Sequence, residues 1–175
     1  MGASQVPATT GSDNWVQISS VTPTASVSTV SFTSISGYKK LMLRVIKPGF
    51  SGSPTTTLTL NSDTGANYAY SAAGISNYTS ITLYDSIYGI NEAGIPLGKS
   101  SSSLGLGALV IINEANTTGV KTISGFAQNT STPTYVYSSL TGEYFASAAI
   151  TTVTITLSTG TFTAAGTVSL YGVAA

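Results

Sequence analysis

Thr152-Val153-Thr154-Ile155-Thr156-Leu157, near the C-terminus, alternates a hydroxyl side chain with an aliphatic one at every step. Successive side chains of a β-strand point to opposite faces, so this stretch predicts a strand with one apolar face and one hydroxyl face. Threonine suits such a strand because its branched Cβ packs well on the pleated surface. We expect the aliphatic residues in the core and the hydroxyls outside: Val153, Ile155 and Leu157 inward, and Thr152, Thr154 and Thr156 outward.

The same alternation recurs along most of the chain. It is clearest at 30–33, 41–45, 57–60, 81–83 and 168–170. Turns rich in glycine and proline separate the alternating runs, and no window has a helical period. Short strands at this spacing favour a two-sheet sandwich or barrel, and 175 residues fit a single domain. The sequence therefore predicts an all-β protein.

Three stretches depart from the alternation. Leu109-Val110-Ile111-Ile112 is apolar on both faces, which predicts either a central strand covered on both sides or a strand with one face in a subunit contact. Residues 85–103 contain three glycines, a proline and a run of four serines, and we expect a long loop there. Residues 1–13 are small and polar, so we expect an extended N-terminal arm, with the sandwich domain at 14–175.

Composition excludes several classes of function. The chain has no cysteine and no histidine, so disulfides, thiolate metal sites and the commonest general base are excluded. Charged residues make up 7%, and the formal net charge is zero. Nucleic-acid binding requires a positive surface, which this composition does not supply. Four of the six basic residues fall within 39–47 and alternate with aliphatic residues, which predicts the polar face of one strand.

Serine and threonine, which carry small hydroxyl side chains, make up 55 of the 175 residues. Such a surface carries little charge to keep copies apart, and it favours a protein whose surface is covered by partners. There is no run of 18 apolar residues, so we expect no membrane-spanning helix. Residues 1–6 lack the charged and apolar regions of a signal peptide.

Few residues could form a catalytic site. Lys99-Ser100 is the one Ser–Lys neighbour pair that could act as a nucleophile and base, and lysine–serine neighbours are expected in so serine-rich a chain. Paired-carboxylate chemistry would need two acidic residues in one cleft. The acidic residues are Asp13, Asp63, Asp85, Glu92, Glu114 and Glu143. No nucleotide-binding or hydrolase motif is present, so we expect no enzyme and no catalytic or cofactor-binding site.

The segment 61–67, Asn-Ser-Asp-Thr-Gly-Ala-Asn, places oxygen ligands in the manner of a calcium loop. A calcium loop needs an acidic ligand at its twelfth position, which is Ala72 here. The favoured interpretation is a turn in which Asn and Asp bond to nearby backbone and Gly65 takes a positive φ. We therefore expect no metal site.

Tyrosines gather in two regions of the chain. Their positions are Tyr68, Tyr70, Tyr78, Tyr84, Tyr88, Tyr135, Tyr137 and Tyr144. Tyrosine offers a rigid contact surface with a polar tip, so sheet packing, protein–protein contact and glycan binding are all consistent with it. Sheet packing is the leading interpretation, and the other two remain open.

The chain resembles the small virion structural proteins of tailed bacteriophages. The resemblance is carried, in order, by Trp15-Val16-Gln17-Ile18, Val30-Ser31-Phe32-Thr33-Ser34-Ile35, Gly37-Tyr38-Lys39-Lys40-Leu41, the turn 60–68, Ile150-Thr151-Thr152-Val153-Thr154-Ile155 with Phe162, and Ser169-Leu170-Tyr171-Gly172-Val173. It implies a β-sandwich on the virion exterior and no catalytic residues. The expected fold is a single jelly-roll-like antiparallel β-sandwich.

The resemblance implies a capsid decoration (cement) protein that stabilises the shell. The alternative is a tail, fibre or receptor-binding module that recognises a host surface glycan. We expect a homo-oligomer, and a trimer because icosahedral shells present local three-fold positions. The expected partners are further copies and the major capsid protein or other virion proteins, without nucleic acid, membrane or cofactor.

Overall fold

The computed structural model describes residues 14–76, 82–99, 106–131 and 134–175, with side chains described for 14–73, 89–98, 106–128 and 138–175. These residues form β-strands joined by turns and loops, and no helix occurs among them. Every paired strand is antiparallel to its neighbour. The prediction of an all-β protein is confirmed.

Two sheets make up the sandwich, and a two-strand ribbon closes one end. The large sheet has eight strands, in the order β1 (Val16–Val21), β14 (Thr167–Ala174), β3 (Tyr38–Ile46), β9 (Gly107–Ile112), β10 (Lys121–Ser131), β11 (Thr134–Tyr144), β6 (Tyr68–Ser76) and β7 (Thr82–Glu92). The small sheet has the order β2 (Thr29–Phe32), β12 (Val153–Leu157), β5 (Thr55–Leu60) and β8 (Ile95–Lys99). The ribbon pairs β13 (Phe162–Thr163) with β4 (Gly49–Phe50).

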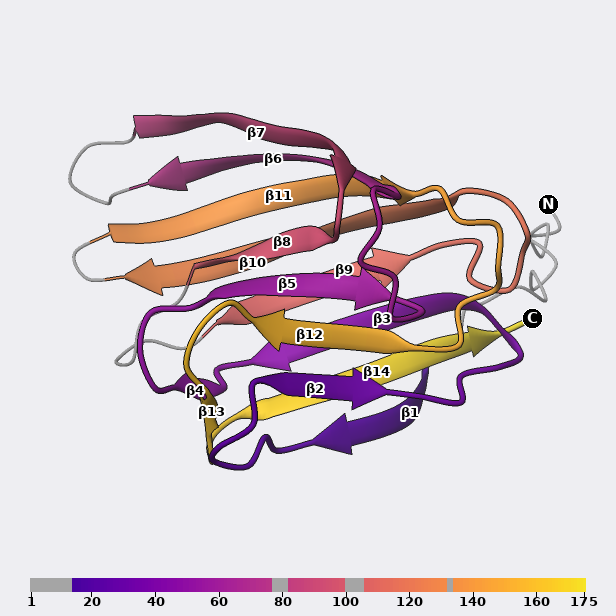
Figure 1. Ribbon diagram of the computed structural model, residues 1–175, viewed down its shortest axis with the longest axis horizontal. Helices are drawn as coiled ribbons and strands as arrows, with labels where there is room; N and C mark the ends of the chain where they lie inside the picture. Colours follow the sequence, from indigo (N-terminus) through magenta and orange to yellow (C-terminus); the bar gives the residue numbers. More distant parts are fainter. Residues whose placement is uncertain (1–13, 77–81, 100–105, 132–133) are drawn as a thin grey trace, which may run out of the picture.

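The core lies between the two sheets. Leu41, Leu43, Val110 and Leu170 of the large sheet and Leu58, Leu60, Val153 and Ile155 of the small sheet are all buried in one cluster. Strands β11, β6 and β7 extend the large sheet beyond the edge of the small one (Figure 1). The alternation of the sequence thus sets the core, since each strand turns its aliphatic face inward.

The strand 153–157 has the predicted inward face. Val153, Ile155 and Leu157 are 0%, 1% and 5% exposed. The outward face needs a correction, because Thr154 is only 8% exposed. It lies between Ser31 and Thr59 of the neighbouring strands, and its hydroxyl bonds with the Ser31 hydroxyl at 3.0 Å. The hydroxyl face is therefore packed against itself rather than fully exposed.

The prediction of a long loop over 85–103 is wrong for residues 85–99, while residues 100–103 lie outside the described residues. Strand β7 continues to Glu92, and β8 runs from Ile95 to Lys99. Pro96 is tolerated because β8 is the edge of the small sheet, where a proline breaks no ladder between two strands. Gly94 is required in the turn between them, since a Cβ there would lie 2.6 Å from Thr57 Cγ2.

Leu109–Ile112 lies in β9, which is the fourth of the eight strands of the large sheet. The predicted central position is confirmed, but the strand is not covered on both sides within the described chain, and the predicted alternative of a subunit contact stays a prediction. Val110 and Ile112 are buried in the core, whereas Leu109 and Ile111 are half-buried on the outer face. The predicted arm, residues 1–13, lies outside the described residues.

Candidate functional site

The outer face of the large sheet, turned away from the small sheet, is the most distinctive surface of the described chain. Its centre is apolar: Met42 pairs with Ile111 across β3 and β9, and Leu109 pairs with Phe126 across β9 and β10. Phe126 is 58% exposed, although it lies on a central strand. We call these four residues the apolar centre. A large side chain exposed at mid-sheet is typical of a contact surface.

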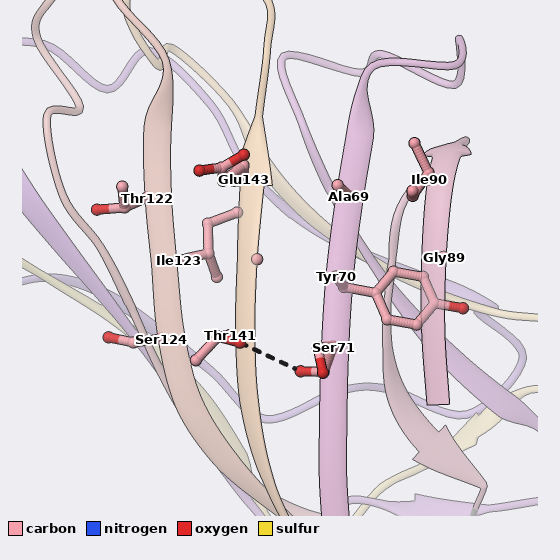
Figure 2. A pocket seen from close by; sticks show the side chains of 11 residues that line it. Ala69, Tyr70, Ser71, Gly89, Ile90, Thr122, Ile123, Ser124, Thr141 and Glu143 are labelled. Atoms are coloured by element: carbon pink, nitrogen blue, oxygen red, sulfur yellow. Dashed lines mark hydrogen bonds between the residues drawn. The ribbon is translucent and has the colours of Figure 1, made fainter. Parts of the chain in front are cut away.

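A groove of about 520 Å³ lies beside the apolar centre, over β10, β11, β6 and β7 (Figure 2). Small hydroxyl residues form its floor because Ser124, Thr141 and Ser71 are register partners across three strands. The Thr141 hydroxyl donates a hydrogen bond to the Ser71 carbonyl at 3.5 Å (Figure 2). Ile90, which is 66% exposed, stands at the β7 side of the groove. The groove thus results from short side chains at one level of the sheet.

Tyr70 lies on the core face of β6, opposite the face that carries the groove, and packs against the core. Its ring extends across Gly89, its register partner (Figure 2), and a Cβ at Gly89 would lie 2.7 Å from the Tyr70 ring. Desolvation and then the charge of Glu92 raise the pKa of Tyr70 above its usual value. The glycine therefore has a packing role, since its missing side chain is replaced by the tyrosine ring.

Charges of opposite sign flank the apolar centre. Lys40 and Arg44 lie on β3, on the same outer face as Met42. Glu143 lies on β11, opposite Thr122 of β10, and is exposed. The predicted polar strand face is confirmed for Lys40 and Arg44. Lys39 has the parity of the core row yet is exposed at the start of the strand, and Lys47 follows its end.

The tyrosines that the structure describes are mainly packing residues. Tyr68 and Tyr144 are 0% and 1% exposed, and their rings stack with centroids 4.8 Å apart. The Tyr68 hydroxyl accepts the Leu60 amide at 2.8 Å, and the Tyr144 hydroxyl donates to Asp63 Oδ2 at 3.0 Å. Desolvation raises the pKa of Tyr68 to about 12, and it also raises the pKa of Tyr144.

The remaining tyrosines fall into two groups. Tyr70 is half-buried and packs against the core. Tyr78 lies outside the described residues, as do the side chains of Tyr84, Tyr88, Tyr135 and Tyr137. Sheet packing is therefore confirmed for Tyr68 and Tyr144, and the half-buried Tyr70 also packs against the core.

The segment 61–67 forms a turn whose oxygens are bonded to protein donors. Asp63 Oδ1 accepts the Gly65 amide at 2.8 Å, and Oδ2 accepts Asn67 Nδ2 at 2.8 Å. The Gly65 bond is the main cause that lowers the pKa of Asp63. The positive φ angles belong to Asn61 and Ser62, at 54° and 55°, so the expectation for Gly65 is wrong.

The donors around this turn explain its shape. The amide of Asp63 bonds back to the Leu60 carbonyl at 2.9 Å, which closes a tight turn with both central residues left-handed. Asn61 Oδ1 accepts the Thr151 amide at 2.7 Å and so joins the turn to the start of β12. Within the described part of the chain, no group of three acidic residues could hold a metal ion.

Lys121 is a buried cation that the sequence pattern did not reveal. It is 0% exposed, and its Nζ donates to the carbonyls of Gly119 at 2.8 Å and Ala146 at 3.0 Å. Desolvation lowers its pKa below the usual value. The ammonium therefore joins the 113–120 loop to the segment after β11. A lysine that begins a strand next to exposed Val120 carries no sequence signal of burial.

The other candidate chemical groups are not assembled into a site. Ser100 lies outside the described residues, as does the side chain of Lys99, so the Ser–Lys pair cannot be placed. Asp13 and the Asp85 side chain also lie outside them. Asp63 is engaged in its turn, while Glu92, Glu114 and Glu143 are exposed. What the described residues bring together is an exposed apolar centre with a groove beside it.

Comparisons with known proteins give no relative. No protein-family model matches the chain, and neither a curated protein nor a solved structure matches it. Within the described residues, no helix could cross a membrane.

Proposed function

We propose that the chain is a structural protein of a bacteriophage virion, a capsid decoration protein that assembles on the outside of the shell and has no catalytic activity. The observation that carries the proposal is the apolar centre, Met42, Leu109, Ile111 and Phe126, on an outer sheet face. A monomer with 7% charged residues and such a face has little to keep it apart from other proteins. The resemblance to virion proteins supplies the location.

The order of the strands supports a jelly-roll core, which is part of this proposal. A jelly-roll core needs eight strands. The candidates are β1, β14, β3 and β9 in one sheet, and β2, β12, β5 and β8 in the other. The chain crosses between the two sheets at almost every connection among these eight, which gives the paired Greek keys of a jelly roll. The hairpins β6–β7 and β10–β11 then extend the first sheet. Jelly rolls are frequent among viral capsid and lectin domains, so the fold supports the proposal by analogy alone.

The proposed assembly is a homotrimer that binds the major capsid protein, with the arm at residues 1–13 as part of the contact. The trimer follows from the resemblance, because three-fold positions on an icosahedral shell match a three-fold oligomer. Zero net charge supports protein partners over nucleic acid. No membrane and no cofactor take part in this account.

The test is whether the chain cements a shell. Capsids of the encoding phage that lack the chain should lose their integrity at a lower temperature than complete capsids, and purified chain should restore the difference. Albumin at the same concentration is the control. If added chain leaves the disruption temperature of the shell unchanged, the cement function is contradicted.

The groove favours one alternative, a tail, fibre or receptor-binding module for a host surface glycan. Glycan sites combine hydroxyl donors with an aromatic ring, and here Ser124 of the groove lies two residues before the exposed Phe126 on the same face of β10. A glycan array would test it directly. Binding that is lost in Phe126→Ala, with the variant still folded, would favour this module over the decoration protein.

A further inference from the structure

We infer that two copies of the chain pack the outer faces of their large sheets together about a two-fold axis that runs parallel to the strands, between β9 and β10. This line divides the eight strands into two sets of four. Such an axis places β9 opposite β10 of the second copy, β3 opposite β11, and β14 opposite β6. We call a row of register partners across the sheet a level. Rotation about this axis does not move a residue along the strand direction, so each level of one copy faces the same level of the other. The face must therefore be complementary to itself, level by level.

The first complementarity is of size. One level of the outer face runs through Met42, and its residues in strand order from β14 to β6 are Tyr171, Met42, Ile111, Ser124, Thr141 and Ser71. Three large side chains lie on one side of the axis and three small ones on the other. The axis brings the large set of each copy against the small set of its mate. Met42 then lies opposite Thr141, in the groove of the second copy.

The second complementarity is apolar. At the next level, Leu109 and Phe126 are register partners on either side of the axis. The two-fold places Leu109 of each copy opposite Phe126 of the other, so two identical apolar pairs meet at the centre. This position explains why a side chain that is 58% exposed in the single chain lies on a central strand. Buried aromatic residues at the centre of an interface commonly dominate its stability.

The third complementarity is of charge. Lys40 lies two residues before Met42 on β3, and Glu143 lies two residues after Thr141 on β11. The antiparallel registers put both at one level of the sheet. The axis therefore sets Lys40 of each copy opposite Glu143 of the other, and the pair occurs twice. An axis perpendicular to the strands would not preserve this level.

The area is sufficient for a specific contact. The six strands from β14 to β6 at about 4.8 Å spacing and seven residues at about 3.4 Å rise give a face of about 29 Å by 24 Å. Two such faces bury roughly 1,400 Å² in total, which lies within the range of specific interfaces. Packed sheets lie about 10 Å apart, so side chains from both copies fill the space between them.

This contact extends the proposed self-assembly and does not depend on the virion. A two-fold contact yields an even number of copies: a dimer alone, or a hexamer where trimers also form. A trimer without any even-numbered species would overturn the two-fold contact and leave the proposed function standing. Failure to bind capsids would overturn the proposed function and leave the contact standing.

The experiment is charge reversal across the axis, read by sedimentation velocity of the full chain at micromolar concentration. Wild type should sediment as an even-numbered oligomer. Lys40→Glu and Glu143→Lys each bring like charges together and should weaken the association at least tenfold. The double variant restores opposite charges and should recover most of it. Recovery in the double variant is the result that an effect on folding alone would not give.

A second variant tests the apolar centre. Phe126→Asp should convert the oligomer into species of half the mass, since it places two carboxylates in the interface. Val16→Asp is the matched control, because Val16 is also 58% exposed but lies on the edge strand β1. Circular dichroism should show both variants folded. The inference is overturned if wild type is monomeric at 100 µM, if Phe126→Asp does not change the mass, or if the double reversal is as weak as the single ones.

Discussion

The rings of Tyr68 and Tyr144 stack with their centroids 4.8 Å apart, and both hydroxyls bond to the turn that holds Asp63. The two strands that carry them, β6 and β11, are neighbours in the large sheet. Asp63 follows β5 of the small sheet. This pair therefore ties the two sheets together at one end of the sandwich, with polar tips satisfied inside an apolar contact.

Removal of one hydroxyl should show the strength of this tie. Tyr144→Phe deletes the hydrogen bond to Asp63 Oδ2 and should lower the free energy of unfolding by about 1.5 kcal/mol, as is usual for bonds to a charged group. The measurement is urea unfolding followed by circular dichroism. Tyr38→Phe is the control, since it is the Tyr38 ring that packs against Gly172, and it should change stability by less than about 0.5 kcal/mol. Equal losses in both variants would contradict the role of the bond.

Acid should weaken the same turn. The pKa of Asp63 is lower in the folded chain than its ordinary value of 3.8, so the unfolded chain takes up the proton first as the pH falls. The stability from this group is complete above pH 3.8 and is lost as the pH falls through the folded pKa. Asp63→Asn should be less stable at pH 7 and lose less stability between pH 5 and pH 2. Parallel pH profiles for the two proteins would contradict this prediction.

One buried hydroxyl should be replaceable with a gain. Thr56 is 0% exposed on the core face, and its Oγ1 has no hydrogen-bond partner among the described residues. Thr56→Val removes this unsatisfied group at nearly constant volume and should stabilise the fold by about 1 kcal/mol. Thr154→Val is the matched control, because it deprives Ser31 of its partner and should destabilise by about 1 kcal/mol. Thermal unfolding of both variants measures the difference in sign.

Two glycines of the large sheet should respond differently to alanine. A Cβ at Gly125 would overlap the Leu109 carbonyl and lie 2.9 Å from Val110 Cα, so the backbone of β9 must shift. Gly125→Ala should cost about 1 to 3 kcal/mol. At Gly107 the nearest atom would be 3.7 Å away, so Gly107→Ala should be neutral or slightly stabilising. Similar melting temperatures for both variants would show that the close approach of β9 and β10 is misjudged.

Alternation in the sequence predicted the core because the buried face of each strand can be identified from the residues of that strand alone. Val153, Ile155 and Leu157 face inward as expected, and Leu109–Ile112 is a central strand. The strands within 85–103 were missed because glycine and proline there are typical of a loop. The features that allow these residues in strands lie on other strands of the fold. Gly89 is filled by Tyr70 of another strand, and Pro96 is acceptable only because β8 is an edge.

The candidate surface was less predictable, since it depends on register between strands far apart in the chain. The sequence showed only that the run 109–112 is apolar on both faces. It could not show that Met42 and Phe126 join this run, or that Lys40 and Glu143 share one level of the sheet. These relations arise only when the strands are paired.

The virion assignment has the widest consequences of the account. The direct measurement is co-sedimentation of purified chain with capsids and, separately, with tails of the encoding phage, each prepared without it. We predict saturable binding to capsids, at a copy number that is a multiple of three, and loss of binding when residues 2–13 are deleted from a chain that still folds. Binding to tails alone would move the protein to the tail. Binding to neither, at any concentration up to 100 µM, would contradict the proposed function.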